Sequence, residues 1–162
     1  MAADPVIVSS GVSGYLSLVS VDNKQPVFAG QVLARIDDRH FRTVLDQVTA
    51  QVTAARGETN NLHEEIKQRM LAITRAHVRA EAGEDELAVA RRQLDELQGQ
   101  LRLAQDTLAN REVVERRAEL YLGYTTIVAP VDGIVRTRRL RVGQYVQADE
   151  ELMTVVPLEA IW

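Results

Sequence analysis

Two patterns of apolar residues occur along the chain, and they predict two kinds of structure. Residues 6–36 and 125–157 carry short runs of valine and isoleucine separated by glycine, proline, asparagine and aspartate. This pattern is typical of short strands joined by tight turns. Between residues 27 and 129 there is no proline, and apolar residues recur every three or four positions, which predicts helix. We therefore divide the chain into two β-rich segments, 1–37 and 124–162, and a helical segment, 38–123.

The helical segment carries signals for its two ends and for a coiled-coil seam. Asp37 and Asp38 are good N-cap residues, and Gly123 fits the position just after a helix end. Apolar residues at heptad spacing predict a seam along which two helices pack. The seam consists of Leu45, Val48, Leu62, Ile66, Leu94, Leu101 and Leu108, and polar residues interrupt the pattern at Thr59, Arg69, Arg111 and Glu115.

The two β-rich segments can form one folded body only if the helical segment turns back on itself near its midpoint. Gly83 lies there and can cap the returning helix, so we expect a turn at about residues 80–85. Each arm is then roughly 60 Å long at about 1.5 Å per residue. A rival turn signal at 57–61 gives unequal arms that cannot return to the same base. We interpret it as a kink, and we expect Gly57 and Gly99 at similar heights, as a close helix crossing or a hinge requires.

The two β-rich segments also resemble each other. An offset of 119 positions places Val12 on Val131, Gly14 on Gly133 and, without a gap, residues 21–36 on residues 140–155. Half-motifs this short cannot bury their strands alone, so we expect the halves to pack on each other as a two-sheet sandwich. In this interpretation each half supplies one set of strands. Gly14 and Gly133 occupy equivalent turns or bulges, where a positive φ or a close backbone approach excludes a side chain.

Composition narrows the possible functions. The chain of 162 residues has 19 basic and 23 acidic side chains, a net charge of −4 and no cysteine. The acidic balance argues against a nucleic-acid partner. The lack of cysteine excludes disulfides, thiol catalysis and zinc sites built on thiolates. No apolar run reaches the roughly 18 residues that span a bilayer, and the N-terminus shows no signal-peptide core.

The β-rich segments resemble the two lipoyl half-motifs of the membrane fusion protein family, the periplasmic adaptors typified by the hemolysin D secretion protein. The first half-motif is carried by 12–16 (VSGYL), 21–23 (VDN) and 29–37 (AGQVLARID). The second is carried by 125–135 (TTIVAPVDGIV), 142–146 (VGQYV) and 152–157 (LMTVVP). The Asp22-Asn23 turn resembles the branch that serves major-facilitator multidrug exporters.

The resemblance implies an α+β fold, namely a split lipoyl- or biotinyl-like β-sandwich interrupted by a long antiparallel α-helical coiled-coil hairpin. It also implies a membrane anchor before the sandwich and a β-barrel after it, so we expect this chain to be a fragment of a longer adaptor. The implied location is the periplasm, with the full-length protein anchored to the inner membrane. The implied partners are an inner-membrane transporter of major-facilitator or ABC type, an outer-membrane channel and copies of the adaptor itself, arranged in a ring.

The resemblance also implies that the hairpin tip contacts the outer-membrane channel. The tip residues that we expect to take part are Arg75, Arg79, Glu81, Gly83 and Glu84. Adaptors that use tubular channels often carry an Arg–Leu–Ser pattern at this point. That pattern is absent here, because the sequence has no serine after Ser20.

The sequence gives little support for a carrier, a metal site or an enzyme. A lipoyl or biotinyl carrier needs a lysine at the hairpin joining its two half-motifs, but here that junction is the helical insertion, and the lysines Lys24 and Lys67 lie elsewhere. We therefore expect no cofactor. His40, His63 and His77 lack the spacing of metal ligands, and no nucleophile–base pair is evident, so we expect no enzyme activity. The basic run of Arg136, Arg138, Arg139 and Arg141 fits a solvated strand, or less often a contact with a neighbouring protein or anionic headgroups.

These observations predict a non-catalytic periplasmic adaptor of a multidrug efflux or secretion system. The alternative is a cytosolic coiled-coil scaffold without a role in export. The two hypotheses differ in what the neighbouring parts of the gene encode. A membrane anchor before this segment and a β-barrel after it would favour the adaptor, and the presence of neither would favour the scaffold.

Overall fold

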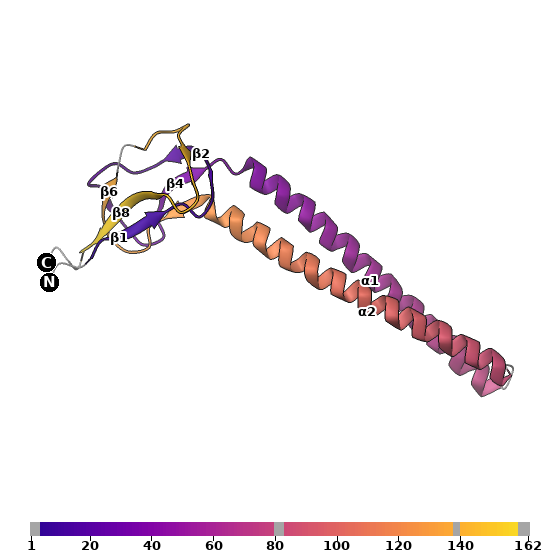
Figure 1. Cartoon of the computed structure of the whole chain (residues 1–162). Coiled ribbons are helices and arrows are strands. Elements are labelled where there is room, and N and C mark those ends of the chain that lie inside the picture. Colours follow the sequence, from indigo (N-terminus) through magenta and orange to yellow (C-terminus); the bar gives the residue numbers. More distant parts are fainter. Residues whose placement is uncertain (1–3, 80–82, 138–139, 159–162) are drawn as a thin grey trace. The chain divides into compact units, whose positions relative to one another are not determined.

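The computed structural model describes residues 4–79, 83–137 and 140–158, which form eight strands and two long helices (Figure 1). In chain order they are β1 (Val6–Ser9), β2 (Gly14–Val19), β3 (Pro26–Val27), β4 (Val32–Ile36), α1 (Arg39–Arg79), α2 (Glu84–Tyr124), β5 (Thr126–Val128), β6 (Gly133–Thr137), β7 (Tyr145–Val146) and β8 (Glu151–Pro157). The chain forms two compact units: residues 1–45 with 117–162, which we call the β-unit, and residues 46–116, which we call the hairpin unit. The expected α+β fold, a β-sandwich interrupted by a helical hairpin, is confirmed.

The β-unit contains two four-stranded antiparallel sheets whose strands come from both halves of the sequence. One sheet has the order β1-β8-β6-β3, and the other has the order β5-β4-β2-β7. The expectation that each half supplies one set of strands is therefore wrong, because every sheet takes two strands from each half. The halves interleave because β1, β3, β5 and β7 each pair with a strand of the other half, whereas only the pairs β2–β4 and β6–β8 join strands of the same half.

Backbone hydrogen bonds follow the 119-residue repeat and give the β-unit a pseudo-twofold symmetry. The N–H of Leu16 donates to the carbonyl of Gln144 at 2.8 Å, and the N–H of Val135 donates to the carbonyl of Gln25 at 3.0 Å. Each of these two bonds maps onto the other when the offset is applied. The strand pairs β2–β7 and β3–β6 correspond to each other in the same way. The sequence repeat is therefore a repeat of the backbone structure.

The core of the β-unit lies between the two sheets and is almost entirely aliphatic. Leu16, Leu33 and Val135 are at most 1% exposed, and burial of each such side chain contributes about 1.5–3 kcal/mol. The core residues come from both half-motifs: Val8, Val12, Leu16, Val21, Val27, Leu33, Ala34, Ile36, Ile127, Ala129, Val135, Val146, Leu152, Met153 and Val155. Because each half leaves its apolar face open, neither half has a core without the other.

Gly14 and Gly133 are the first residues of β2 and β6, and each lies against another part of the chain. A Cβ atom at Gly133 would lie 2.1 Å from the carbonyl oxygen of Val156, and one at Gly14 would lie 2.5 Å from Cγ2 of Ile36. Neither glycine has a positive φ. Both positions therefore require glycine because a neighbouring group leaves no room for a side chain, and not because of the backbone conformation.

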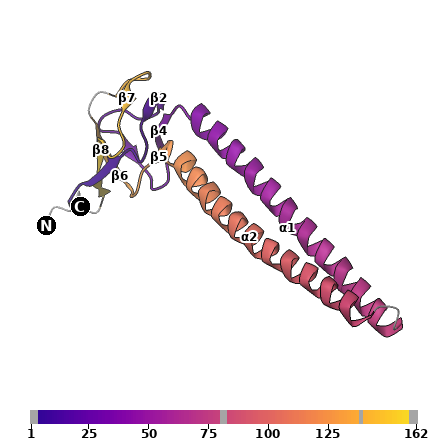
Figure 2. The same cartoon turned by 45° about the vertical axis from the view of Figure 1, so that its right-hand side comes forward.

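In the hairpin unit, α1 and α2 run antiparallel to each other (Figures 1 and 2). A narrow strip of apolar side chains on the two helices is buried. Val48 and Ile66 on the expected seam are buried, and its other members, Leu45, Leu62, Leu94, Leu101 and Leu108, are half-buried. Val52, Leu97 and Ala104 are also buried. The strip is narrow because only two helices form it, so the opposite faces of both helices remain in solvent.

The glycines inside the helices do not mark a close crossing. α1 continues without a break through residues 57–61. A Cβ atom at Gly57 or Gly99 would have no neighbouring atom within 4 Å. The expectation that these glycines let the helices cross closely is therefore wrong, since the space beside both of them is open.

Polar residues that interrupt the heptad pattern are accommodated by hydrogen bonds. The Thr59 hydroxyl is buried and donates to the Ala55 carbonyl at 3.0 Å. Arg69 Nη1 donates to Gln93 Oε1 at 2.6 Å across the two helices. Likewise, Arg111 Nη1 donates to Gln51 Oε1 at 3.1 Å. These cross-helix pairs join residues that are equally far from the turn, so they also report the register of the hairpin.

The helix ends show which capping signals act in the folded chain. The Asp38 carbonyl accepts the N–H of Arg42 at 2.9 Å, so α1 begins where the N-cap pattern predicted. α2, in contrast, continues through Gly123 to Tyr124, so the expected role of Gly123 as the residue after the helix end is wrong. Its last turn is closed by Thr125, whose N–H and hydroxyl both donate to the Leu122 carbonyl. With that carbonyl satisfied, no left-handed glycine is needed.

Candidate functional site

The tip of the hairpin unit is the site that the sequence singles out for partner contact. Arg75, Arg79, Gly83 and Glu84 are exposed, and Glu81 lies outside the described residues. The N–H of Leu87 donates to the Gly83 carbonyl at 3.1 Å, so Gly83 caps α2. The exposed residues are thus carried by the last turns of one helix and the first turn of the next, which hold their backbones in place.

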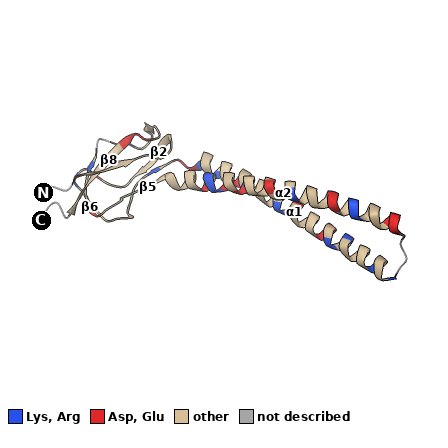
Figure 3. Cartoon of the chain, turned by 60° about the horizontal axis from the view of Figure 1, so that its bottom comes forward, with Lys and Arg blue, Asp and Glu red and all other residues tan. Residues whose placement is uncertain are grey.

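Charges at the tip match the helix dipoles. The first turn of α2 carries Glu84, Asp85 and Glu86, and the last turn of α1 carries His77 and Arg79. Figure 3 shows how acidic and basic residues are distributed along the two helices. Acidic groups are stabilised at a helix N-terminus and basic groups at a C-terminus, by about 0.3–1 kcal/mol each. The same residues therefore stabilise the turn and present both signs of charge at its surface.

Apolar surface accompanies these charges. Val78 beside Arg79 is 78% exposed. Below it, a shallow groove runs between α1 and α2 and is lined by Arg69, Ala72, Ile73, Ala76, Glu86, Leu87 and Ala90. Small alanine side chains leave the groove open, so it can accept an apolar side chain from a partner helix, as a hole accepts a knob in a coiled coil.

In the β-unit, the first residues before α1 form a local ion pair at the surface. Arg39 Nη2 lies 2.6 Å from Asp37 Oδ2, and the N–H of Arg39 donates to Asp37 Oδ1 at 3.1 Å. The hydrogen bonds from Arg39 hold the pKa of the Asp37 carboxyl below its ordinary value. A second pair, Arg42 with Asp38, is separated by 2.8 Å. The carboxylates of Asp37 and Asp38 are thus both paired with arginines at the surface.

Residues considered for other chemistry are scattered. His40, His63 and His77 are exposed at different points of α1, and no cluster of three metal-ligating side chains occurs within residues 4–79, 83–137 and 140–158. Lys24 and Lys67 are exposed on a turn and on α1. Of the basic run, Arg136 and Arg141 are exposed, whereas Arg138 and Arg139 lie outside the described residues. Within the described part of the chain, neither helix contains a stretch apolar enough to cross a membrane.

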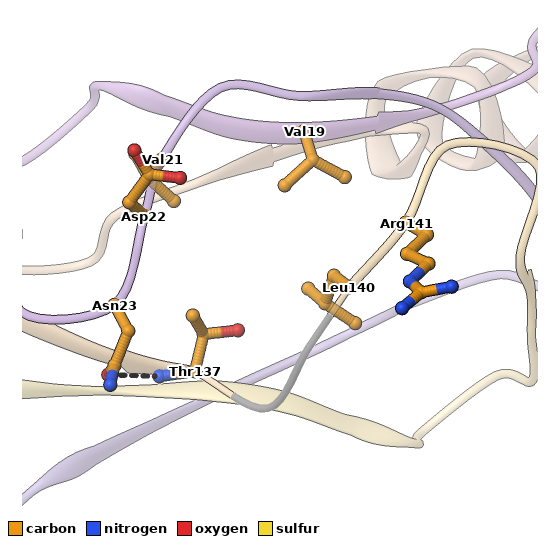
Figure 4. Close-up of a pocket in the computed structure, with 7 residues that line it drawn as sticks. All are labelled: Val19, Val21, Asp22, Asn23, Thr137, Leu140 and Arg141. Atoms are coloured by element: carbon orange, nitrogen blue, oxygen red, sulfur yellow. Dashed lines mark hydrogen bonds between the residues drawn. The ribbon is translucent and has the colours of Figure 1, made fainter.

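The sequence analysis missed a cavity between two turns of the β-unit. It has a volume of about 360 Å³ and is lined by Val19, Val21, Asp22, Asn23, Thr137, Leu140 and Arg141 (Figure 4). The 119-residue offset could have indicated it, since this offset places Asp22 on Arg141 and Val21 on Leu140. What the sequence could not show is that the symmetry axis brings these equivalent residues around one cavity.

Comparison with known proteins places these features in context. A family model described as "RND MFP, barrel-sandwich hybrid domain" matches residues 4–158. The multidrug resistance protein MdtA of Pectobacterium carotovorum is 28% identical over 149 residues, which are 92% of this chain and 33% of that protein. MdtA of Escherichia coli O157:H7 is 29% identical over 156 residues, which are 96% of this chain and 35% of that protein.

Among solved structures, MacA from Actinobacillus actinomycetemcomitans has the same fold. Its TM-score is 0.83 at 23% identity, with 97% of this chain and 50% of that chain covered. The chain spans about a third of the length of the curated relatives that it matches.

Proposed function

Since the chain belongs to the RND membrane fusion protein family, we propose that it is the hairpin-bearing part of a periplasmic adaptor in a multidrug efflux or secretion system. In this role the adaptor links an inner-membrane transporter to an outer-membrane channel. Its function is mechanical and not enzymatic: it gives the exported substrate a closed path between the two membranes.

The observation that carries the proposal is a β-sandwich whose two halves are separated in sequence by an antiparallel helical hairpin with an exposed, charged tip. A scaffold that needs only a coiled coil does not require an interleaved β-sandwich in the same chain. The two relatives named above are both multidrug resistance proteins, which favours efflux as the process that this chain serves.

We propose that the tip residues Arg75, Arg79, Gly83 and Glu84 contact the outer-membrane channel, together with Glu81. The exposed arginines and acidic groups supply specificity. The shallow groove between α1 and α2, which Leu87 helps to line, accepts an apolar side chain of the channel. For the inner-membrane partner, the description of the family model favours a transporter of the RND class over the major-facilitator and ABC classes expected from the sequence. In the assembled pump, copies of the adaptor form a ring, and the full-length protein is anchored in the inner membrane.

Photo-cross-linking in living cells tests this proposal. A photoreactive amino acid replaces Arg79 in the full-length protein that contains this chain, and captured proteins are identified by mass spectrometry. The matched control places the same group at Arg102, an exposed arginine on α2 far from the tip. We expect an outer-membrane channel to be captured from position 79 and not from position 102. Capture of cytosolic proteins alone, or equal capture of the channel from both positions, contradicts the proposal and favours the scaffold.

A further inference from the structure

The cavity between the two turns of the β-unit carries charges of opposite sign at symmetry-related positions. The offset of 119 residues relates Asp22 to Arg141 and Val21 to Leu140, and all four line the cavity. Two pairs of equivalent residues therefore line one cavity. A symmetric backbone thus presents an asymmetric pair of side chains, a carboxylate on one side and a guanidinium on the other.

These two charges do not satisfy each other. In the described part of the chain no ion pair joins the Asp22 carboxylate to the Arg141 guanidinium, and neither side-chain group has another hydrogen-bonding partner. By contrast, Asp37 and Asp38 near the start of α1 are both paired with arginines. In Figure 4, Asp22 and Arg141 stand on opposite sides of the cavity, with Val19 and Leu140 between them. Both charges are therefore available to a ligand.

Both turns are held by the same set of hydrogen bonds. The N–H of Gln25 donates to the Asp22 carbonyl at 3.2 Å, and the Gln25 side chain accepts the N–H of Asp22 at 3.0 Å. In the other turn, the N–H of Gln144 donates to the Arg141 carbonyl at 3.1 Å, and its side chain accepts the N–H of Arg141 at 3.2 Å. The backbones that carry the two charges are fixed in advance, which lowers the cost of ordering a site around a ligand.

The remaining walls combine apolar and polar groups. Val21 is 4% exposed, and Val19 and Leu140 are half-buried, so the cavity has an apolar base. Asn23 Oδ1 accepts the N–H of Thr137 at 3.3 Å, which joins the first turn to the end of β6 at the edge of the cavity. An apolar base with a few fixed polar groups is the usual composition of a small-molecule site.

We propose that this cavity binds a small zwitterionic molecule whose cationic and anionic groups are separated by a short apolar body. The cationic group lies against Asp22, the anionic group against Arg141, and the apolar body against Val19, Val21 and Leu140. A ligand with one charge leaves the other side of the cavity unmatched, so the zwitterion binds more tightly than either half of it. This proposal does not depend on the adaptor role, because it concerns a ligand of the β-unit and not a partner of the hairpin tip.

A titration followed by ¹⁵N–¹H NMR tests the proposal on the 162-residue chain. The probe is 6-aminohexanoate, and the single-charge probes are hexylammonium and hexanoate. We expect 6-aminohexanoate to shift the amide signals of Asn23 and Thr137, with an affinity about threefold to fivefold higher than that of either single-charge probe, as is typical of one exposed charge pair. Asp22→Asn and Arg141→Gln are each expected to remove that advantage. Glu151→Gln and Arg136→Gln, which alter exposed charges on β8 and β6, are expected to keep it.

The symmetry supplies a sharper variant. Because positions 22 and 141 are equivalent, the double substitution Asp22→Arg with Arg141→Asp exchanges the two charges and keeps both of them at the cavity. We expect this variant to bind 6-aminohexanoate as tightly as the original chain, with the ligand reversed. Equal affinity for all three probes, signal shifts away from the cavity, or no loss on substituting Asp22 or Arg141 overturns the proposal. Dispersed amide spectra of the variants show that they are folded.

Discussion

Lys24 and Gly143 occupy equivalent turns of the β-unit and share a left-handed backbone, with φ of 69° and 91°. The same offset relates Gly30, with φ of 84°, to Asp149, with φ of 66°. Each pair thus has a glycine on one side and a larger residue on the other. The backbone of the two halves is more alike than their side chains, because the hydrogen bonds of the turns fix φ whichever residue is present.

Lys24→Gly is expected to stabilise the β-unit. A left-handed backbone costs a residue with a side chain about 1–2 kcal/mol, whereas glycine adopts it readily but loses more entropy on folding. We expect the free energy of unfolding in urea to rise by about 1 kcal/mol relative to Lys24→Ala, which removes the side chain and keeps the strain. The reverse change, Gly143→Ala, is expected to lower it by a similar amount. Equal stability of Lys24→Gly and Lys24→Ala is the result that contradicts this account.

Gly133→Ala is expected to be more damaging than Gly14→Ala, although the two glycines are equivalent by symmetry. The added Cβ at Gly133 meets the backbone oxygen of Val156, whereas at Gly14 it meets only the Cγ2 methyl group of the buried Ile36 side chain, which can shift with less disruption than a strand backbone. We expect losses of about 3 kcal/mol and about 1 kcal/mol, within the range for overpacked sites. Urea denaturation followed by circular dichroism measures both, and a larger loss for Gly14→Ala shows that the approach at Gly133 is not as close as described.

Gly57→Ala and Gly99→Ala are expected to stabilise the hairpin unit. Both glycines lie inside helices with open space where a methyl group would stand, so alanine gains helix propensity without a clash, about 0.8–1 kcal/mol at each site. Hydrogen exchange of amides in residues 46–116 measures the gain. Gly83→Ala is the contrasting variant, since Gly83 caps α2 and alanine is a poor cap. A loss of stability at position 57 or 99 indicates that the glycine is needed for packing.

The Asp37–Arg39 pair makes the start of α1 sensitive to acid. Because the pKa of Asp37 is lowered in the folded state, the pair stabilises the fold above the unfolded pKa of about 3.9 and is lost as the pH falls through the lower folded value. NMR titration of the Asp37 side-chain carbonyl carbon is expected to give a midpoint below the ordinary one, and Arg39→Gln is expected to raise it. Arg42→Gln, whose partner is Asp38, is the control that should leave it unchanged.

Much of the fold was predictable because it follows from local patterns. The lack of proline between 27 and 129 and the heptad spacing predicted two helices, and Gly83 indicated where the second begins. The sequence predictions were wrong where two nearby residues could each end a helix, and where the contact in question involved a residue far away in the sequence. Gly123 looked like a helix end, but α2 continues through it and Thr125 closes the last turn. Gly57 and Gly99 looked like a close crossing, but the space beside both of them is open.

The two candidate sites also differ in whether the sequence alone could indicate them. The hairpin tip was found from sequence, because any antiparallel hairpin must expose the residues at its turn. The cavity between Asp22 and Arg141 was not found, although both residues stood in motifs that had been singled out. Its recognition needs the fold to bring residues 119 positions apart to the same place.

By itself, the sequence determined the helical centre, the turn and the existence of two equivalent β-halves, since periodicity, proline placement and an internal repeat act over short distances along the chain. Only the tertiary structure decided that the halves interleave, so that Leu16 and Val135 share one core and Asp22 faces the same cavity as Arg141. The physical reason is that four of the six strand pairs join residues far apart in the sequence, and a local pattern of residues does not specify which distant strand becomes the partner.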